Sequence, residues 1–155
     1  MTQASDLAGA ARRIIDANRY LTLATADADG RPWATPVWFA PDGYTAFVWV
    51  SRPDARHSRN IAGRPNVGIV IFDSTVPVGG GQAVYVEALA EQVPPADLEP
   101  AIEMYSYRSK SHGAGPWRVA DVIGSASHRL YRAEASAHYL LVRNDARIPV
   151  DPNAT

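Results

Sequence analysis

The sequence predicts a mainly β fold in which an antiparallel barrel carries helices at its periphery. About six or seven segments are rich in β-branched and aromatic residues, and tight turns separate most of them. Strands joined by short turns pair antiparallel, whereas parallel strands need a long crossover. Only about three segments show the apolar spacing of a helix. No linker or repeat divides the chain, so a single domain over residues 1–155 is expected.

The first half of the chain is expected to hold two helices and four strands. Apolar residues at helical spacing, such as Leu7 and Ile14, predict an amphipathic helix over residues 5–18. A brief helix capped by Asp54 is predicted over 54–62. Strands are expected over 20–26, 33–40, 44–51 and 67–72, the first three as an antiparallel meander and the last buried on both faces.

The second half continues the barrel, which is expected to span about residues 20–142. Pro94 and Pro95 should end a long strand, because proline has no N–H to donate, and Asp97 should cap the next helix. The predicted elements are a bent strand, a helix, two final strands and a C-terminal tail, over 82–93, 97–107, 128–133, 138–142 and 148–155.

Charge and composition exclude several classes of function. The 15 Lys and Arg nearly balance the 16 Asp and Glu, so the net charge of −1 gives no attraction to nucleic acid or to an anionic membrane. Without cysteine the chain forms no disulfide and no thiolate metal site, and its four histidines lack metal-ligand spacing. No apolar run approaches the ~20 residues that cross a bilayer, and no signal-peptide pattern opens the chain. A cytoplasmic location is therefore expected.

The segment from Ser51 to Asn60 has the composition of a phosphate site. Three arginines, a histidine and two serines gather there between a strand and the start of a helix. Helix N-terminal amides attract anions, and guanidinium groups match phosphate oxygens in pairs. The alternative is that these arginines form the solvated face of a surface helix. The residues alone leave both interpretations open.

Several motifs occur in a characteristic order. They are Asp29-Gly30-x-Pro32-x-Ala34-Thr35-Pro36-Val37-Trp38-Phe39, a strand ending at Ser51, Ala55-Arg56-His57-Ser58-Arg59-Asn60-Ile61, Asn66-Val67 and Val86-Glu87-x-x-Ala90-Glu91. In this order and spacing they resemble the pyridoxamine 5'-phosphate oxidase-like, flavin-binding split-barrel family. The resemblance covers about residues 20–93 well and the remainder weakly.

The resemblance implies a Greek-key-like split β-barrel that forms a symmetric homodimer and holds two flavin mononucleotides (FMN) at the subunit interface. It places residues 35–39 beside the flavin ring and Arg56 and His57 on the phosphate, with Gln82 reaching the ring from the partner strand. The implied cofactor contacts are Thr35, Pro36, Val37, Trp38, Phe39, Val50, Ser51, Arg52, Arg56, His57 and Gln82.

Three departures separate the chain from the vitamin oxidase itself. His57 stands in place of the usual lysine, Thr35 in place of an arginine, and residues 128–132 do not preserve the oxidase's substrate-binding pattern. Oxidation of pyridoxamine phosphate is therefore not expected. The leading hypothesis is a flavin-dependent oxidoreductase that takes hydride from a reduced nicotinamide or another small donor, with no catalytic side chain assigned.

Two other functions stay open. The fold could bind the 8-hydroxy-5-deazaflavin coenzyme, whose acidic tail would need basic residues such as Arg59, Arg64 or Lys110. It could also be a non-catalytic flavin or haem carrier or sensor. In the glycine-rich segment 109–117, the residues Lys110, His112 and Trp117 could cover a substrate cleft, or the segment could be a solvated connection.

Overall fold

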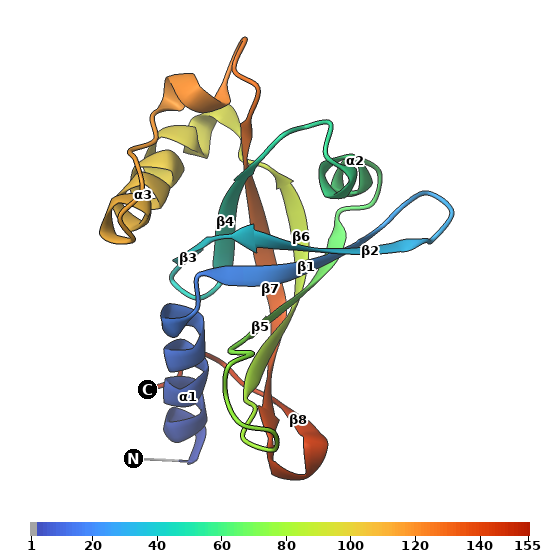
Figure 1. Cartoon of the computed structure of the whole chain (residues 1–155), viewed down its shortest axis with the longest axis vertical. Coiled ribbons are helices and arrows are strands. Elements are labelled where there is room, and N and C mark those ends of the chain that lie inside the picture. Colours follow the sequence, from blue (N-terminus) through green and yellow to red (C-terminus); the bar gives the residue numbers. More distant parts are fainter. Residues whose placement is uncertain (1–2) are drawn as a thin grey trace.

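Residues 3–155, which a computed structural model describes, form one eight-stranded antiparallel sheet with three α-helices around it (Figure 1). The strands are β1 (Tyr20–Ala26), β2 (Pro32–Trp38), β3 (Ala40–Asp42), β4 (Ala46–Ser51), β5 (Asn66–Phe72), β6 (Ala83–Gln92), β7 (Arg129–Val142) and β8 (Ala146–Pro149). The helices are α1 (Gln3–Ala17), α2 (Arg56–Gly63) and α3 (Leu98–Ser111), with short 3₁₀ turns η1 (Pro95–Asp97), η2 (Val119–Val122) and η3 (Arg143–Asp145). None of the helices in this part of the chain is long and apolar enough to cross a membrane.

The strand order confirms the predicted antiparallel half-barrel but not the predicted meander. The order is β2-β1-β5-β6-β7-β4-β3, with β8 beside β7. β4 pairs with β7 along its whole length, from Ala46 to Ser51, and leaves β2 paired with β1 alone among the described strands. Phe39 lies between β2 and β3 with a fully buried ring, and there the chain turns away from β2. β4 is apolar on both faces, which suits a strand inside the sheet.

The last strands form a single element. The two strands predicted on either side of residues 134–137 are one unbroken strand, β7, of 14 residues. Small residues in its middle weaken the strand signal, but pairing with β6 holds them in the sheet, with an irregularity in register at Glu87 and Ala88. The segment expected as a tail begins inside β8, because Ile148 pairs with Leu140.

Three further local predictions were wrong. Asp54 and Asp97 do not cap helices, because their carboxylates bind Arg52 at 3.0 Å and Arg132 at 3.1 Å. Ion pairing with a neighbouring arginine takes the carboxylate away from the helix start. β5 is not buried on both faces, since buried Val67, Ile69 and Ile71 alternate with more exposed residues. One face of this part of the sheet therefore lies at the surface.

Two apolar clusters hold the sheet and helices together. The larger one fills the space between the inner face of the sheet and α1, which contributes Ala11, Ile14 and Ile15. The smaller one lies under α3, where Ile102 and Tyr105 pack against β3, β4 and β7. Figure 1 shows α1 and α3 at opposite ends of the sheet, so each cluster fixes a different end. The candidate site described below lies between α3 and α2.

The turn from β3 to β4 is held from two sides. Gly43 and Tyr44 both have positive φ, of 58° and 61°, which is unfavourable for tyrosine. The Tyr44 hydroxyl donates to Asp16 on α1 at 2.7 Å, and its carbonyl accepts from Nε2 of His138 on β7 at 2.8 Å. These bonds tie the turn to a helix and to a distant strand, which offsets the cost of the backbone conformation.

We expect His138→Ala to destabilise the protein by about 1–3 kcal/mol, because the Tyr44 carbonyl loses a partly buried donor. Ser136→Ala is the matched control, since exposed Ser136 on the same strand also donates to a carbonyl, that of Glu87. It should cost less than about 0.5 kcal/mol. Chemical denaturation measures the free energy of unfolding of both variants. Equal losses of that free energy would contradict a stabilising role for the bond between His138 and the Tyr44 carbonyl.

Stability should also fall on acidification. Burial lowers the pKa of His138 below its ordinary 6.5, so the unfolded chain takes up the proton first as the pH falls. The contribution of the neutral imidazole is present above about pH 6.5 and is lost as the pH falls towards the folded value. The melting temperature should drop between about pH 7.5 and 5.5, and it should drop less in His138→Ala.

Candidate functional site

The candidate site is built around the junction between β4 and α2. Ser51 is the last residue of β4 and is buried, and the chain then turns so that the Ala55 N–H bonds to the Arg52 carbonyl at 3.1 Å. α2 begins directly after this turn. Its first N–H groups have no partner inside the helix, and such groups attract anions. The junction therefore has the backbone of an anion site.

Ser51 and His57 fasten the strand end to the helix. The Ser51 Oγ lies 2.8 Å from Nε2 of His57. His57 is half-buried, and burial lowers the pKa of its imidazole below 6.5. The imidazole is therefore neutral at pH 7 and supplies a hydrogen-bonding group. A lysine at this position would supply a permanent charge, so the junction carries less positive charge than the segment's composition suggests.

The three arginines of the predicted phosphate site have different partners. Arg52 pairs with Asp54 at 3.0 Å, and Arg59 donates to the Asp54 carbonyl. The Arg56 guanidinium lies over the indole of Trp33, 4.4 Å from the ring centroid, and forms no ion pair with any residue from 3 to 155. An aromatic face orients a cation without neutralising it. Of the three, Arg56 has neither a carboxylate nor a carbonyl partner among residues 3–155, so its N–H groups are available to a ligand.

The five residues expected beside a flavin ring lie on β2 and directly after it. Val37 and Phe39 point into the core, with 8% and 0% of their surface exposed, so they can offer a ligand only their backbone. Thr35 and Trp38 are partly exposed and Pro36 is exposed. One edge of β2 pairs with β1, and the other pairs with no strand of the described chain. Its backbone groups there are available.

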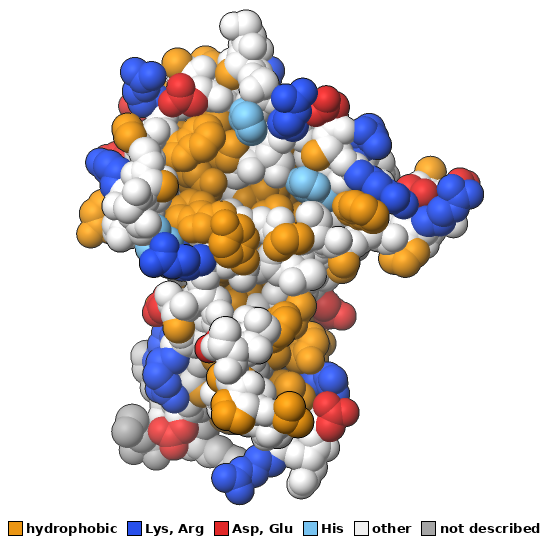
Figure 2. Space-filling model, in the orientation of Figure 1, with side chains coloured by type: hydrophobic (Ala, Val, Ile, Leu, Met, Phe, Trp, Pro, Cys, Tyr) orange, Lys and Arg blue, Asp and Glu red, His pale blue; other side chains and the backbone are white. Residues whose placement is uncertain are grey.

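A row of aromatic rings lies at the far end of β2. In spatial order it contains His112, Trp38, Tyr105, Trp117 and His128, with centroid distances of 5.5, 4.9, 5.9 and 6.2 Å and edge-to-face geometry throughout. We call this set the aromatic row. Figure 2 shows a patch of hydrophobic side chains on this side of the molecule, with histidines at its margin. The row forms one wall of the site.

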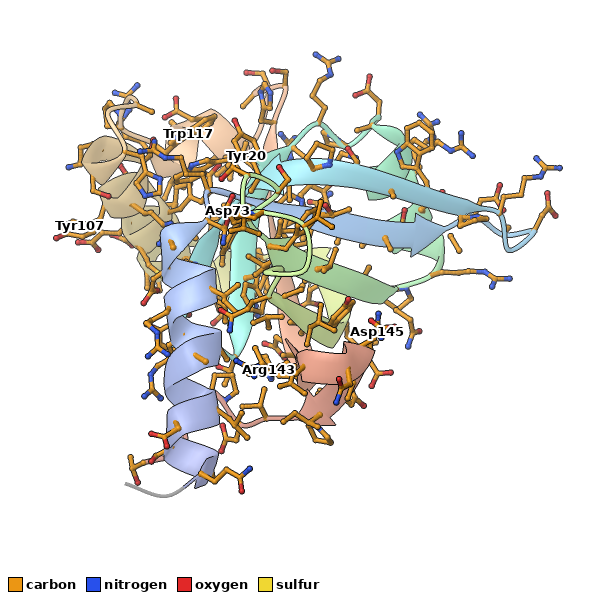
Figure 3. The ribbon with its side chains drawn as sticks, turned by 60° about the horizontal axis from the view of Figure 1, so that its bottom comes forward. Tyr20, Asp73, Tyr107, Trp117, Arg143 and Asp145 are labelled. Atoms are coloured by element: carbon orange, nitrogen blue, oxygen red, sulfur yellow. The ribbon has the colours of Figure 1, made fainter. Side chains whose placement is uncertain are left out.

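Hydrogen bonds fix the aromatic row to the sheet. The Trp38 indole N–H donates to Nδ1 of His112 at 3.2 Å. Tyr105 is buried and accepts from the backbone N–H of Val50, and its burial raises the pKa of the phenol to about 12. Trp117 lies on the connection beside α3 (Figure 3). A hollow of about 560 Å³ opens next to Trp117 and His128. Four of the residues predicted from sequence therefore meet here: Trp38, Val50, His112 and Trp117.

Two predicted residues lie apart from this cluster. Lys110 is exposed at the end of α3 and forms no ion pair with the described residues. Gln82 lines a different hollow, together with Leu141 and Arg143 near the end of β7, whereas Ser51 pairs with Arg129 at its start. At about 3.3 Å per residue, these ends of the 14-residue strand are about 40 Å apart. One chain does not bring Gln82 to the phosphate site.

Several residues of the site had no signal in the sequence. The sequence assigns no role to Trp33, Tyr105 or His128. It assigns none to Asn60 either, yet Asn60 is buried and its Nδ2 donates to Oγ1 of Thr25 at 3.0 Å, which fastens α2 to β1. Each of these roles depends on a partner far away in the chain. Spacing along the sequence does not reveal such partners.

A family model described as pyridoxamine 5'-phosphate oxidase matches residues 7–140, most of the chain. The chain belongs to this family. The family resemblance expected from the motifs is thereby confirmed, and the match extends beyond the segment in which the motifs were found. No match was found among the curated proteins.

Several solved structures share the fold. The heme storage protein HutZ from Vibrio cholerae aligns at 21% identity and a TM-score of 0.63, covering 81% of this chain and 87% of that one. A FAD-binding protein from Mesorhizobium loti aligns at 19% identity and 0.64, over 84% and 91% of the two chains. An F420 reductase aligns at 22% identity and 0.56, over 77% and 87%. At these identities the similarity concerns the fold alone.

We expect His57 to titrate with a midpoint below 6.5, because burial disfavours its charged form. Inorganic phosphate should raise that midpoint, because an anion at the junction favours the imidazolium. The measurement is the pH dependence of the His57 ring-proton shifts by NMR. Chloride at equal ionic strength is the control. A midpoint above 6.5 without phosphate, or one that phosphate leaves in place, would contradict an anion site.

Proposed function

We propose that this member of the pyridoxamine 5'-phosphate oxidase family binds FMN and acts as a flavin-dependent oxidoreductase on a small molecule. The observation that carries the proposal is the β4–α2 junction. There Arg56 and His57 lie in the first turn of α2, whose first N–H groups have no partner inside the helix, directly after the turn that follows β4. A phosphate monoester is the ligand that such a mixture of charge and donors suits.

The residues present fit the proposed cofactor. Ser51, Arg52, Arg56 and His57 would hold the phosphate, and the free edge of β2 with Val50 would line the ring. Bound flavin would supply the hydride and electron transfer, while the protein supplies binding and orientation. The aromatic row would keep water away from one side of the ring.

A homodimer is part of the proposal. The apolar residues Pro32, Trp33, Ala34 and Pro36 of β2 are all exposed, which leaves this edge strand with uncovered apolar surface. A second copy of the chain would cover that surface. It would also bring its own Gln82 to the site, which the Gln82 of the same chain does not reach. The symmetric dimer thus supplies both missing parts, a cover and a ring contact.

The substrate side of the proposal is less specific. His112 and Trp117 border the end of the site beyond β2, with exposed Lys110 two residues from His112, and a reduced nicotinamide or another small donor would enter there. Oxidation of pyridoxamine phosphate itself is not proposed, because Thr35 supplies no cation where the vitamin oxidase has an arginine. A cytoplasmic location would supply reduced nicotinamide, and it remains part of the proposal.

A deazaflavin coenzyme is the second candidate. Arg59 and Arg64 are exposed beside α2, and Arg64 donates to the Ala28 carbonyl in the β1–β2 turn at 2.8 Å. These cations border the phosphate site and could hold a longer acidic tail. The fold shared with an F420 reductase supports this candidate. A haem carrier is the third candidate, supported by the fold shared with HutZ and by His128 at the margin of the hollow.

The test is the visible absorption spectrum of the purified protein, before and after FMN is added and the excess removed by gel filtration. We expect flavin bands at one per subunit. Arg56→Ala should weaken FMN binding about tenfold to a hundredfold, because a charge-assisted bond to phosphate contributes about 1.5–3 kcal/mol. Arg59→Ala is the matched control on the same helix, since Arg59 is directed at the Asp54 carbonyl. It should retain FMN.

Each outcome distinguishes the candidates. Retention of FMN by wild type and Arg59→Ala, with its loss from Arg56→Ala, supports the proposed function. A protein that does not bind FMN but binds the deazaflavin coenzyme supports the second candidate. A strong Soret band in the spectrum of the purified protein supports the third. If Arg56→Ala and Arg59→Ala weaken FMN binding equally, the phosphate is not held at the β4–α2 junction.

A further inference from the structure

The bond between Trp38 and His112 fixes the state of the histidine ring. An indole N–H can only donate, so Nδ1 of His112, at 3.2 Å, must carry a lone pair. The neutral ring then has its proton on Nε2. The positive charges of Arg108 and Arg19, together with desolvation, act in the same direction, because all three lower the pKa of the imidazole. His112 is therefore a neutral ring whose Nε2–H faces away from Trp38.

The position of this ring is fixed as well as its protonation. His112 ends α3, where its backbone N–H bonds to the Arg108 carbonyl at 3.0 Å and its own carbonyl accepts from Arg19 at 3.4 Å. Trp38 in turn contacts Tyr105 edge to face, with ring centroids 4.9 Å apart. The imidazole is thus anchored through its backbone and through Nδ1. Its Nε2–H makes no hydrogen bond with any residue from 3 to 155.

The surroundings of the free N–H are positively charged. The charged groups that act on His112 are Arg19 and Arg108, and exposed Lys110 lies two residues away on the same helix end. The carbonyls that end α3 accept bonds from the backbone of His112 and from the next two residues, Gly113 and Ala114, which fixes the loop around the ring. A donor N–H among cations is suited to an oxyanion or a polarised carbonyl oxygen.

The place of His112 relative to the phosphate site points to its role. Trp33, under Arg56, and Trp38, beside His112, lie near the two ends of β2, five positions apart. At about 3.3 Å per residue, this distance is about 17 Å. If the phosphate lies at the first end, the second end is where the flavin ring and its reaction partner would meet.

We propose that His112 is a substrate-binding residue that donates its Nε2–H to a carboxylate or carbonyl oxygen of the substrate, and that the enzyme therefore selects compounds bearing such a group. The inference rests on the proposed function and deepens it. Trp38 is the positioning residue, because it keeps the proton on Nε2. No proton is transferred in this role. The partly exposed rings of Trp38 and Trp117 supply apolar surface for the rest of the substrate.

The first part of the test is the tautomer of His112. In protein labelled with ¹⁵N-histidine, long-range ¹H–¹⁵N correlation at neutral pH should show Nε2 protonated and Nδ1 bare. Trp38→Phe should remove this preference, since phenylalanine cannot donate. A protonated Nδ1 in the wild type, or a tautomer that Trp38→Phe leaves unchanged, would overturn the proposal.

The second part measures ligand selection with benzoate as the probe and benzyl alcohol as its neutral counterpart. Benzoate should shift the His112 Nε2 resonance in a saturable way, whereas benzyl alcohol should not. His112→Ala should bind benzoate about tenfold more weakly, and His112→Gln, which keeps an N–H donor, should recover part of the affinity. Tyr107→Ala is the matched control, since Tyr107 is exposed on α3 and is not part of the aromatic row, and it should bind benzoate like wild type.

The outcomes separate this inference from the proposed function. FMN retention by His112→Ala should equal that of wild type, because the phosphate is held at the other end of β2. Three results would overturn the inference alone if the protein retains FMN. They are equal binding of benzoate with and without His112, equal binding of benzoate and benzyl alcohol, and no binding of benzoate. Failure of the wild type to retain FMN overturns the proposed function. The tautomer measurement then still tests the role of Trp38.

Discussion

The pairing of β4 with β7 is the constraint on which the rest of the molecule depends. Six consecutive residue pairs join these strands, from Ala46 with Glu134 to Ser51 with Arg129. Because β4 pairs there, it cannot close the barrel against β2, and β2 keeps one edge free. The pairing of β4 with β7 ends at Ser51, so the chain leaves the sheet there and α2 begins directly after the turn. β7 continues to Val142, and its far end is where Gln82 lies, away from the junction. A free edge of β2, with the β4–α2 junction near one end and the aromatic row near the other, follows from one choice of strand partner.

The β4–α2 junction and the aromatic row each contain a histidine that is a neutral ring with a fixed hydrogen-bonding role. His57 meets a serine hydroxyl, and His112 meets an indole N–H. In both cases the pKa of the imidazole lies below 6.5, at His57 because of burial and at His112 because of desolvation and two nearby arginines. The permanent positive charge near the junction then comes from Arg56, which an aromatic ring orients. A site of this kind discriminates by geometry more than by total charge.

Much of the fold could be predicted from the sequence, because alternation and turn residues are local signals. The span of β1 was predicted to the residue, and the bent β6 and the three helices were predicted closely. The partner of β4 could not be predicted, since a strand buried on both faces pairs equally well with several neighbours. The break placed in β7 shows the limit of propensity: alanines are poor strand formers, yet pairing with β6 decides their conformation. The prediction that Asp97 caps a helix was wrong for the same reason, because its carboxylate pairs with Arg132, 35 residues away.

The site could be predicted in part. The motif around Arg56 and His57 indicated an anion site, and the structure brings Ser51 and His57 into contact. The different partners of Arg52, Arg56 and Arg59 could not be foreseen, because all three have the same chemistry and lie within eight positions of one another. Trp33 and Tyr105 acquire their roles only through the folded chain. Resemblance to a family supplies the location of a site, whereas partner choice among like residues depends on three-dimensional packing.

The separation of Gln82 from the β4–α2 junction has a consequence for defective copies of the protein. In the proposed dimer, each site would combine the junction of one chain with the Gln82 of the other. A chain damaged at Arg56 and a chain damaged at Gln82 would then form a mixed dimer with one intact site and one site carrying both defects. Two inactive alleles could thus restore activity together, up to half that of the normal dimer. A cell carrying both would reveal the shared site without any purified protein.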